Sequence, residues 1–317
     1  KGIAKLGLSK DIPVSQFPAK LVLELRSLTR KYYDLTDERS AHINKLKGDL
    51  HTVFPQYLDV FCDVTGKTST MILRQYGTPD KILRGHKKTM IEKISKASRK
   101  GLAKASERYE KLCAAANAAK TFGCQIDSIY FNIFLTLDLV EKLDSALDSI
   151  LNRIRQLITF NKNEKFIQQI KLLNTIPGVG FLTAVTIMCE IGDFSAFRNP
   201  KQLFAYFGLD PEVNESGKFV GTQLHMSKRG SRIARRAIFA VALASIRTKR
   251  NGEGINPYLR KYYELKSGQK PKMVAIGAVM HKVCNIVFAV LRDEKAFELR
   301  SPEEHCKQYQ RPALAAA

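Results

Sequence analysis

The sequence predicts a mainly helical protein, with a long coiled-coil arm followed by a helical domain that contains a helix-hairpin-helix. Three observations support this fold class. Few stretches alternate between polar and apolar residues, and β-branched runs are scarce. Two long segments repeat apolar residues at spacings of three and four. Between residues 164 and 191, two helical patterns flank a turn rich in proline and glycine.

The predicted arm is built from two apolar seams. The first slips by one residue, which locally unwinds a supercoil, and it ends before Pro55; its members are Leu21, Leu25, Leu28, Tyr32, Leu35, Ile43, Leu46, Leu50 and Val53. The second runs from Ile126 to Ile158, and Asp144 alone breaks it. A helix of roughly 33 residues is about 50 Å long. An apolar seam this long must be covered, so it pairs with the first seam, with another subunit, or with both. The alternative to a coiled coil is that the two segments are ordinary long helices of a bundle.

These patterns predict four parts of the chain. Residues 1–20 carry two glycines and two prolines and resemble the exit from a preceding domain. Residues 21–160 form the arm, with a helical insertion at 65–125. Residues 161–300 form the helix-hairpin-helix domain, and residues 301–317 form a tail. Within the insertion, basic residues outnumber acidic ones, which fits either a solvated helix face or a nucleic-acid surface.

The charge balance narrows the class of partner. The 52 Lys and Arg residues against 30 Asp and Glu residues give a net charge of +22, which favours binding to polyanions. No run of 18 apolar residues exists, so we expect no membrane partner, and nucleic acid is the preferred one. The six cysteines include no C-x-x-C pair, and no histidines lie at zinc-ligand spacing, so no metal site is predicted within this chain.

The predicted hairpin needs glycines at two positions for a physical reason. In Ile176-Pro177-Gly178-Val179-Gly180, Gly178 and Gly180 permit positive φ and remove Cβ, so backbone N–H groups can approach a phosphate oxygen. The positive end of the following helix dipole adds to this attraction. We therefore predict that both glycines contact a nucleic-acid backbone; a plain turn between helices is the alternative.

A strongly basic segment follows. Residues 216–252 contain no acidic side chain and nine cations. Ser231 is a suitable N-cap for a helix that ends near Arg247, and the arginines at i, i+3 and i+4 share one face of it. Unpaired guanidinium groups bind phosphate with two parallel donors. The predicted nucleic-acid-binding cations are Lys218, Lys228, Arg229, Arg232, Arg235 and Arg236.

Ser227 is the candidate catalytic residue. It precedes the Lys228-Arg229 pair and lies close to the start of the predicted helix. A serine hydroxyl is a poor nucleophile by itself, but nearby cations and amide dipoles stabilise a developing alkoxide and the charged transition state of phosphoryl transfer. The alternative is that Ser227 only caps a turn in a phosphate-binding loop.

Residues 171–297 resemble the C-terminal domain of the insertion sequence 110 family of transposases, which are related to Piv-type DNA invertases. The matching pieces, in order, are "LLNTIPGVG", "AVTIMCEIGDFSAFRNPKQLFAYFGLDP", "SG", "SKRGSRIARRAI" and "KPKMVAIGAVMHKVCNIVFAVL". The two seams resemble the coiled-coil connector of that family more loosely. The resemblance implies that Ser227 is the nucleophile of a DNA recombinase and forms a covalent phosphoserine link to DNA.

The resemblance also implies partners. Family members begin with a RuvC-like domain whose four acidic residues bind Mg²⁺, and nothing in this sequence matches those residues. We therefore expect this chain to be inactive alone. The implied partners are DNA, a structured guide RNA of the bridge type and further copies of the protein in a dimer or tetramer. The implied location is the cytoplasm of a prokaryote, at the nucleoid.

Two other classes of function remain open. A non-catalytic module could hold DNA or RNA through the helix-hairpin-helix and the basic stripe. A scaffold that binds junctions or loads a helicase is a further possibility, although the sequence lacks the G-x-x-x-x-G-K-[ST] loop of an ATPase.

Overall fold

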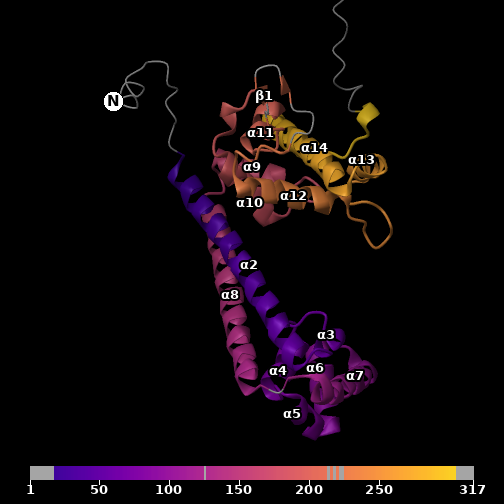
Figure 1. Ribbon diagram of the computed structural model, residues 1–317. Coiled ribbons are helices and arrows are strands. Elements are labelled where there is room, and N and C mark those ends of the chain that lie inside the picture. The colour runs from indigo at the N-terminus through magenta and orange to yellow at the C-terminus, as the bar shows by residue number, and fades with distance from the viewer. Residues whose placement is uncertain (1–17, 125, 213–214, 217–218, 221–224, 305–317) are drawn as a thin grey trace, which may run out of the picture. The chain divides into compact units, whose positions relative to one another are not determined.

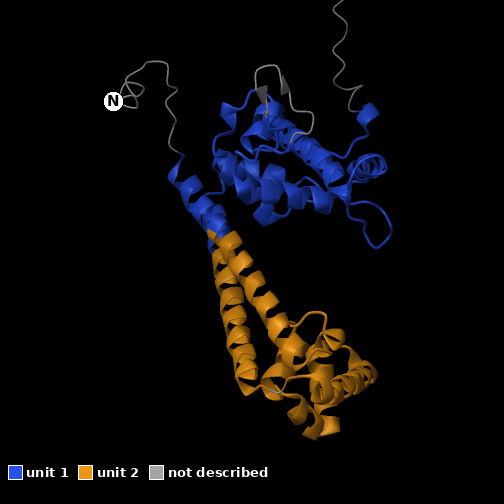
Figure 2. Ribbon diagram, in the orientation of Figure 1, with its two compact units in different colours: residues 1–30, 153–317 blue, residues 31–152 orange. Residues whose placement is uncertain are grey.

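The computed structural model describes residues 18–124, 126–212, 215–216, 219–220 and 225–304 (Figure 1). This part of the chain is mainly helical, which confirms the predicted fold class. It forms two compact units (Figure 2). Unit 2 consists of residues 31–152, and unit 1 combines residues 1–30 with 153–317. The predicted remnant at 1–20 and the tail at 301–317 lie mostly outside the described residues.

Two long helices form the stem of unit 2. Helix α2 (Lys20–Val53) and helix α8 (Asp127–Phe160) each run without a break, so the slip in the first seam bends no helix. Within unit 2 the two helices lie side by side in the same chain (Figure 2). The Tyr130 hydroxyl of α8 donates to the Val53 carbonyl of α2, with an O–O distance of 3.3 Å. The two helices thus contact each other within one chain, while the pairing of their seams in a coiled coil stays a prediction.

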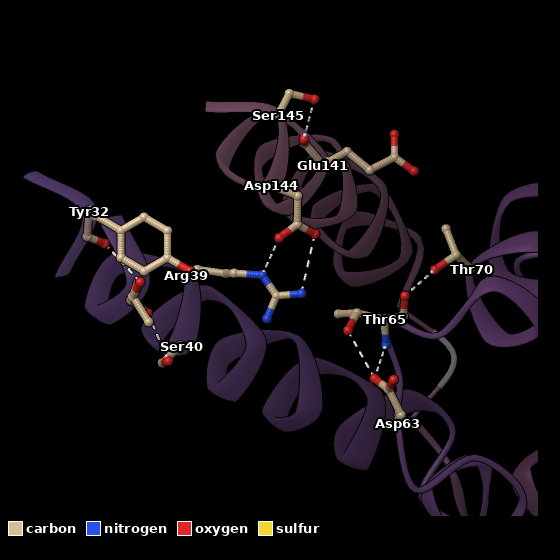
Figure 3. A network of polar contacts seen from close by, with 10 residues as sticks. Tyr32, Arg39, Ser40, Asp63, Thr65, Thr70, Glu141, Asp144 and Ser145 are labelled. Atoms are coloured by element: carbon tan, nitrogen blue, oxygen red, sulfur yellow. Dashed lines mark hydrogen bonds and ion pairs between the residues drawn. The ribbon is translucent and has the colours of Figure 1, made fainter. Parts of the chain in front are cut away.

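An ion pair explains the one break in the second seam. Arg39 of α2 donates through Nε to Asp144 Oδ1 at 2.5 Å and through Nη2 to Oδ2 at 3.2 Å (Figure 3). This hydrogen bonding raises the pKa of the Arg39 guanidinium. A two-pronged pair between facing helices fixes their register, because a shift of one turn would leave both charges without partners.

Five shorter helices connect α2 to α8, in the place of the predicted insertion. They are α3 (Tyr57–Val60), α4 (Lys67–Gln75), α5 (Pro79–Arg84), α6 (Lys87–Ser98) and α7 (Gly101–Phe122). The Thr78 side chain caps α5 by accepting from the Lys81 amide, as its sequence predicts. Their core surrounds Tyr57, whose fully buried hydroxyl hydrogen-bonds to Ser69. Burial raises the pKa of Tyr57 strongly.

Unit 1 is a cluster of helices with one small hairpin. Ser231 caps its helix as the sequence predicts, because its side chain accepts from a backbone N–H three residues ahead. The side chains of Asn199 and Asn256 cap two other helices in the same way. The elements are α9 (Lys165–Leu173), α10 (Phe181–Ile191), η1 (Phe194–Ala196), α11 (Pro200–Tyr206), β1 (Glu215–Ser216), β2 (Phe219–Val220), α12 (Arg232–Ile246), α13 (Pro257–Ser267) and α14 (Lys272–Asp293). Strands β1 and β2 pair antiparallel.

Helix α14 is the core helix of unit 1. It has the length and composition of a membrane-spanning helix, but ten of its side chains are buried. It packs against α9, α11, α12 and α13 (Figure 1). Its apolar surface is therefore used inside the unit, and α12 packs against it.

Candidate functional site

Two loops of unit 1 cross at a pair of glycines. Gly208, after α11, has φ of +66°, and a Cβ there would lie 2.5 Å from the amide nitrogen of Gly230. A Cβ at Gly230 would lie 2.0 Å from the Tyr206 carbonyl oxygen and 2.6 Å from the Phe207 carbonyl carbon. Because all these are backbone atoms, no side-chain rotation could relieve the contacts. Both positions require glycine for the two loops to meet.

Backbone hydrogen bonds join the same two loops. The Ser227 amide donates to the Asp210 carbonyl at 2.8 Å, and the Lys228 amide donates to the Gly208 carbonyl at 3.0 Å. One step further out, the Glu212 amide donates to the His225 carbonyl at 2.7 Å. The segment that carries Ser227 is therefore aligned with the segment that follows α11.

This alignment places a carboxylate beside the predicted nucleophile. The half-buried Ser227 hydroxyl donates to Asp210 Oδ1 with an O–O distance of 2.6 Å. That length is within the normal range for a hydrogen bond between two oxygens. Ser227 thus lies neither in an apolar interior nor among cations alone. Asp210 is not among the sequence-predicted site residues, because it precedes the acid-free segment 216–252. The "GLDP" turn at residues 208–211 was the available signal.

Arg235 holds the Ser227 loop from the side of α12. Its Nη1 donates to the carbonyl oxygens of Phe207, Lys228 and Gly230 at 3.2, 3.2 and 2.7 Å. A guanidinium can satisfy several carbonyls at once because its donors form a fixed planar fork. The structure thus gives Arg235 a role in positioning the loop, and its predicted contact with nucleic acid stays a prediction.

The other predicted cations surround the start of α12. Lys228, Arg229 and Arg232 are exposed, and Arg236 is half-buried one turn further along the helix. Lys228 has φ of +54°, a left-handed conformation that costs a non-glycine residue about 1–2 kcal/mol. The helix therefore begins with positive side chains at the end of its dipole that already attracts anions. Lys218 lies outside the described residues.

An open pocket lies at this end of α12. Its volume is about 450 Å³, and Arg26, Arg30, Glu190, Arg229 and Ser231 contribute to its walls. Arg30 donates to both oxygens of the buried Glu190 carboxylate at 2.8 and 2.9 Å. Three guanidinium groups against one carboxylate leave the pocket wall with a positive balance, which suits an anion.

The charge of Glu190 depends on these partners. Burial by itself would raise its pKa, but hydrogen bonds from Arg30 and Ser231 and the charges of Arg30 and Arg26 outweigh it, so the pKa of Glu190 is lowered. Glu190 therefore stays ionised at neutral pH and ties α2 to α10 within unit 1.

The predicted hairpin lies between α9 and α10. Gly178 has φ of +95°, and a Cβ there would lie 2.7 Å from the Ser245 hydroxyl of α12, which donates to the Pro177 carbonyl at 3.0 Å. The lack of a side chain at Gly178 is thus explained by packing against α12. Around Gly180, at the start of α10, a Cβ would meet nothing within 4 Å. Phosphate binding at the two glycines stays a prediction.

No group of three or more His, Cys, Asp or Glu side chains that could hold a metal ion occurs among the described residues.

Comparisons with known proteins relate the part of the chain that carries this site to transposases. A family model described as "Transposase IS116/IS110/IS902 family" matches residues 170–264, which include Asp210, Ser227 and Arg235. The chain is 23% identical over 286 residues to the "Insertion element IS110 uncharacterized 43.6 kDa protein" of Streptomyces coelicolor, covering 89% of this chain and 66% of that relative.

Two further relatives have more descriptive names. The "Pilin gene-inverting protein" of Moraxella bovis is 30% identical over 177 residues, which cover 56% of this chain and 52% of that protein. The "Transposase for insertion sequence element IS1111A" of Coxiella burnetii is 26% identical over 188 residues, covering 57% and 50%. The chain spans about half to two thirds of the length of these relatives. The family model covers residues 170–264, and this part of the chain therefore resembles the IS116/IS110/IS902 family of transposases.

Proposed function

We propose that this chain is the part of a DNA transposase or site-specific recombinase in which the Ser227 hydroxyl attacks a DNA phosphate and forms a phosphoserine link. The observation that carries the proposal is the setting of this hydroxyl. It is half-buried, bonded to a carboxylate at 2.6 Å and followed directly by the exposed cations Lys228 and Arg229. The family-model match over residues 170–264 and the pilin gene inversion named for a relative support the same class of activity.

The cations have a defined task in this proposal. A phosphodiester carries one negative charge, and attack by serine adds charge to the phosphorane-like transition state. Lys228, Arg229 and Arg232, together with Arg236 and the N-terminus of α12, would stabilise that charge and hold the neighbouring phosphates. Binding of this kind does not read base sequence, because its contacts go to the backbone of the nucleic acid.

Base sequence would then be chosen by another partner. We propose that a structured guide RNA of the bridge type pairs with the DNA, as in other RNA-guided systems in which base pairing reads sequence and protein grips the backbone. A net charge of +22 fits a protein that holds both nucleic acids. The proposal also includes a RuvC-like domain with Mg²⁺, assembly into a dimer or tetramer, and a cytoplasmic location at the nucleoid.

A trapping experiment tests the serine chemistry. The protein expressed from its complete gene is incubated with its RNA and a nicked DNA substrate, and the covalent protein–DNA adduct is measured on a denaturing gel. Ser227→Ala should abolish the adduct. Ser195→Ala is the matched control, because Ser195 also donates to an aspartate, Asp193, at 2.7 Å. An adduct that persists in Ser227→Ala would refute the assignment.

A salt titration, read together with the recombination assay, distinguishes a catalytic recombinase from a non-catalytic binding module. Arg229→Gln should weaken DNA binding for all sequences alike and reduce the slope of log K against log salt by about 0.9, the value for one lost phosphate contact. Lys261→Gln, at an exposed cation of α13, should leave the slope unchanged. If Arg229→Gln weakens binding and reduces the salt slope while Ser227→Ala retains full recombination, the chain is a binding module without catalytic chemistry.

A further inference from the structure

We infer that Asp210 is the residue that takes the proton from Ser227, which makes the pair, rather than the serine alone, the nucleophilic unit. This inference rests on the proposed function, since it describes how the same hydroxyl becomes reactive. Neither the family match nor the names of the relatives assigns a role to Asp210.

The contact has the geometry of a proton transfer. The hydroxyl oxygen and Asp210 Oδ1 are 2.6 Å apart, within the range for general-base catalysis. Both side chains are half-buried, so the carboxylate is partly shielded from water while the hydroxyl remains open to a substrate. A carboxylate that accepts a hydroxyl proton directly is an established arrangement in phosphoryl transfer, where protein kinases use an aspartate in this way.

Several other contacts hold Ser227 and Asp210 in place. The Ser227 amide also bonds to the Asp210 carbonyl, so the two residues are joined by main chain and side chain at once. The glycine crossing and the three bonds from Arg235 fix the loops on either side. A pair held from several directions keeps its geometry without reorganisation when the substrate arrives.

The surrounding charges explain why a base is needed beside so many cations. The segment 216–252 contains no carboxylate, and its Lys and Arg side chains are donors without an acceptor atom. Lys228 and Arg229, next to Ser227, favour negative charge on the serine oxygen. Asp210 supplies a carboxylate acceptor from outside this segment, bonded directly to the hydroxyl.

The step is balanced as follows. The Ser227 oxygen forms a bond to phosphorus while its proton passes to Asp210. The bond between phosphorus and one deoxyribose oxygen breaks, and that oxygen leaves with the electron pair and takes up one proton from solvent. When a deoxyribose hydroxyl later attacks the phosphoserine, its oxygen bonds to phosphorus and its proton passes to solvent. The bond from phosphorus to the serine oxygen breaks, and Asp210 returns its proton to Ser227. No oxidant, reductant or further reactant is consumed.

A phosphorylating probe tests this inference without DNA, RNA or other domains. The 317-residue chain is treated with a fluorescent fluorophosphonate; the serine oxygen bonds to phosphorus, fluoride leaves, and the proton goes to the base. Labelled residues are identified by peptide mass spectrometry. We expect Ser227 to be labelled faster than Ser195. Asp210→Asn should slow its labelling by about 100-fold or more, in keeping with the usual contribution of a general base.

Chemical rescue distinguishes a base from a merely structural side chain. In Asp210→Ala, added formate should restore labelling of Ser227, because a small carboxylate can occupy the vacated space. Asp193→Asn and Asp193→Ala are the matched controls at the other serine–aspartate pair and should leave Ser227 labelling unchanged. Thermal melting of each variant verifies that it is folded.

Every outcome is decisive. Labelling of Asp210→Asn at the wild-type rate, failure of formate to rescue Asp210→Ala, or a wild-type Ser227 no faster than Ser195 would each overturn the inference. If labelling depends on Asp210 but no protein–DNA adduct forms in the complete protein, the proposed recombinase function fails while the serine–aspartate pair stands.

Discussion

Replacing Gly230 by alanine provides a direct test of the crossing that supports Ser227. The new Cβ would lie 2.0 Å from the Tyr206 carbonyl oxygen, at least 1 Å closer than real Cβ contacts allow. The two loops must separate, which breaks the backbone bonds from Ser227 and Lys228 to the segment after α11. Two such bonds contribute about 2 kcal/mol, and overpacking adds about 1–3 kcal/mol. We therefore expect a loss of about 3–5 kcal/mol.

The expected change is large enough to measure by thermal unfolding. For a unit of 150–250 residues, each kcal/mol lowers Tm by about 2–4 °C, so Gly230→Ala should lower it by about 6–20 °C. Hydrogen exchange at the Ser227 amide should also accelerate. Gly180→Ala is the matched control, because its Cβ would meet nothing within 4 Å. If the two variants melt at the same temperature, the loops do not cross as described.

Two further predictions concern ion pairs. Glu190→Gln should destabilise unit 1 by about 1–3 kcal/mol at pH 7, the usual range for hydrogen bonds to a charged group. The folded-state pKa of Glu190 is lowered, so this contribution to stability is fully present above the unfolded-state pKa of about 4.3. It is lost as the pH falls through the folded-state pKa. The free energies of urea unfolding of wild type and variant should therefore converge at low pH. Asp144→Leu should destabilise unit 2 by no more than about 1 kcal/mol, because the Arg39–Asp144 pair is partly exposed to solvent. Adding Arg39→Leu should recover most of the loss, and a double variant no more stable than the single one would contradict this account.

The helices were predictable because their signals are local. Ser231, Asn199 and Thr78 each precede a helical pattern and can reach an amide only three residues away, so sequence spacing alone specifies the cap. The long seams were visible for a similar reason, since their period is set by the helix itself. Such features need no knowledge of the tertiary fold.

The details of the site were not predictable in this way. Asp210 and Ser227 are 17 positions apart, and their contact depends on the crossing at Gly208 and Gly230. The sequence shows glycines there but not which backbone each one meets. Gly178 is a related case, because its glycine is explained by Ser245 of α12, far along the chain. Arg235 could be recognised as a cation, but the carbonyls it binds are assembled only by folding.

The order of the two units along the chain has a consequence for synthesis on the ribosome. Unit 2 is continuous, whereas unit 1 waits for partners far downstream, since Arg26 donates to the Cys189 carbonyl and Arg30 to Glu190, 163 and 160 positions later. At about 5–20 residues per second, the start of α2 emerges roughly 8–30 s before these partners. During translation unit 2 can therefore finish folding, including the two helices of its stem, before unit 1 has all of its residues.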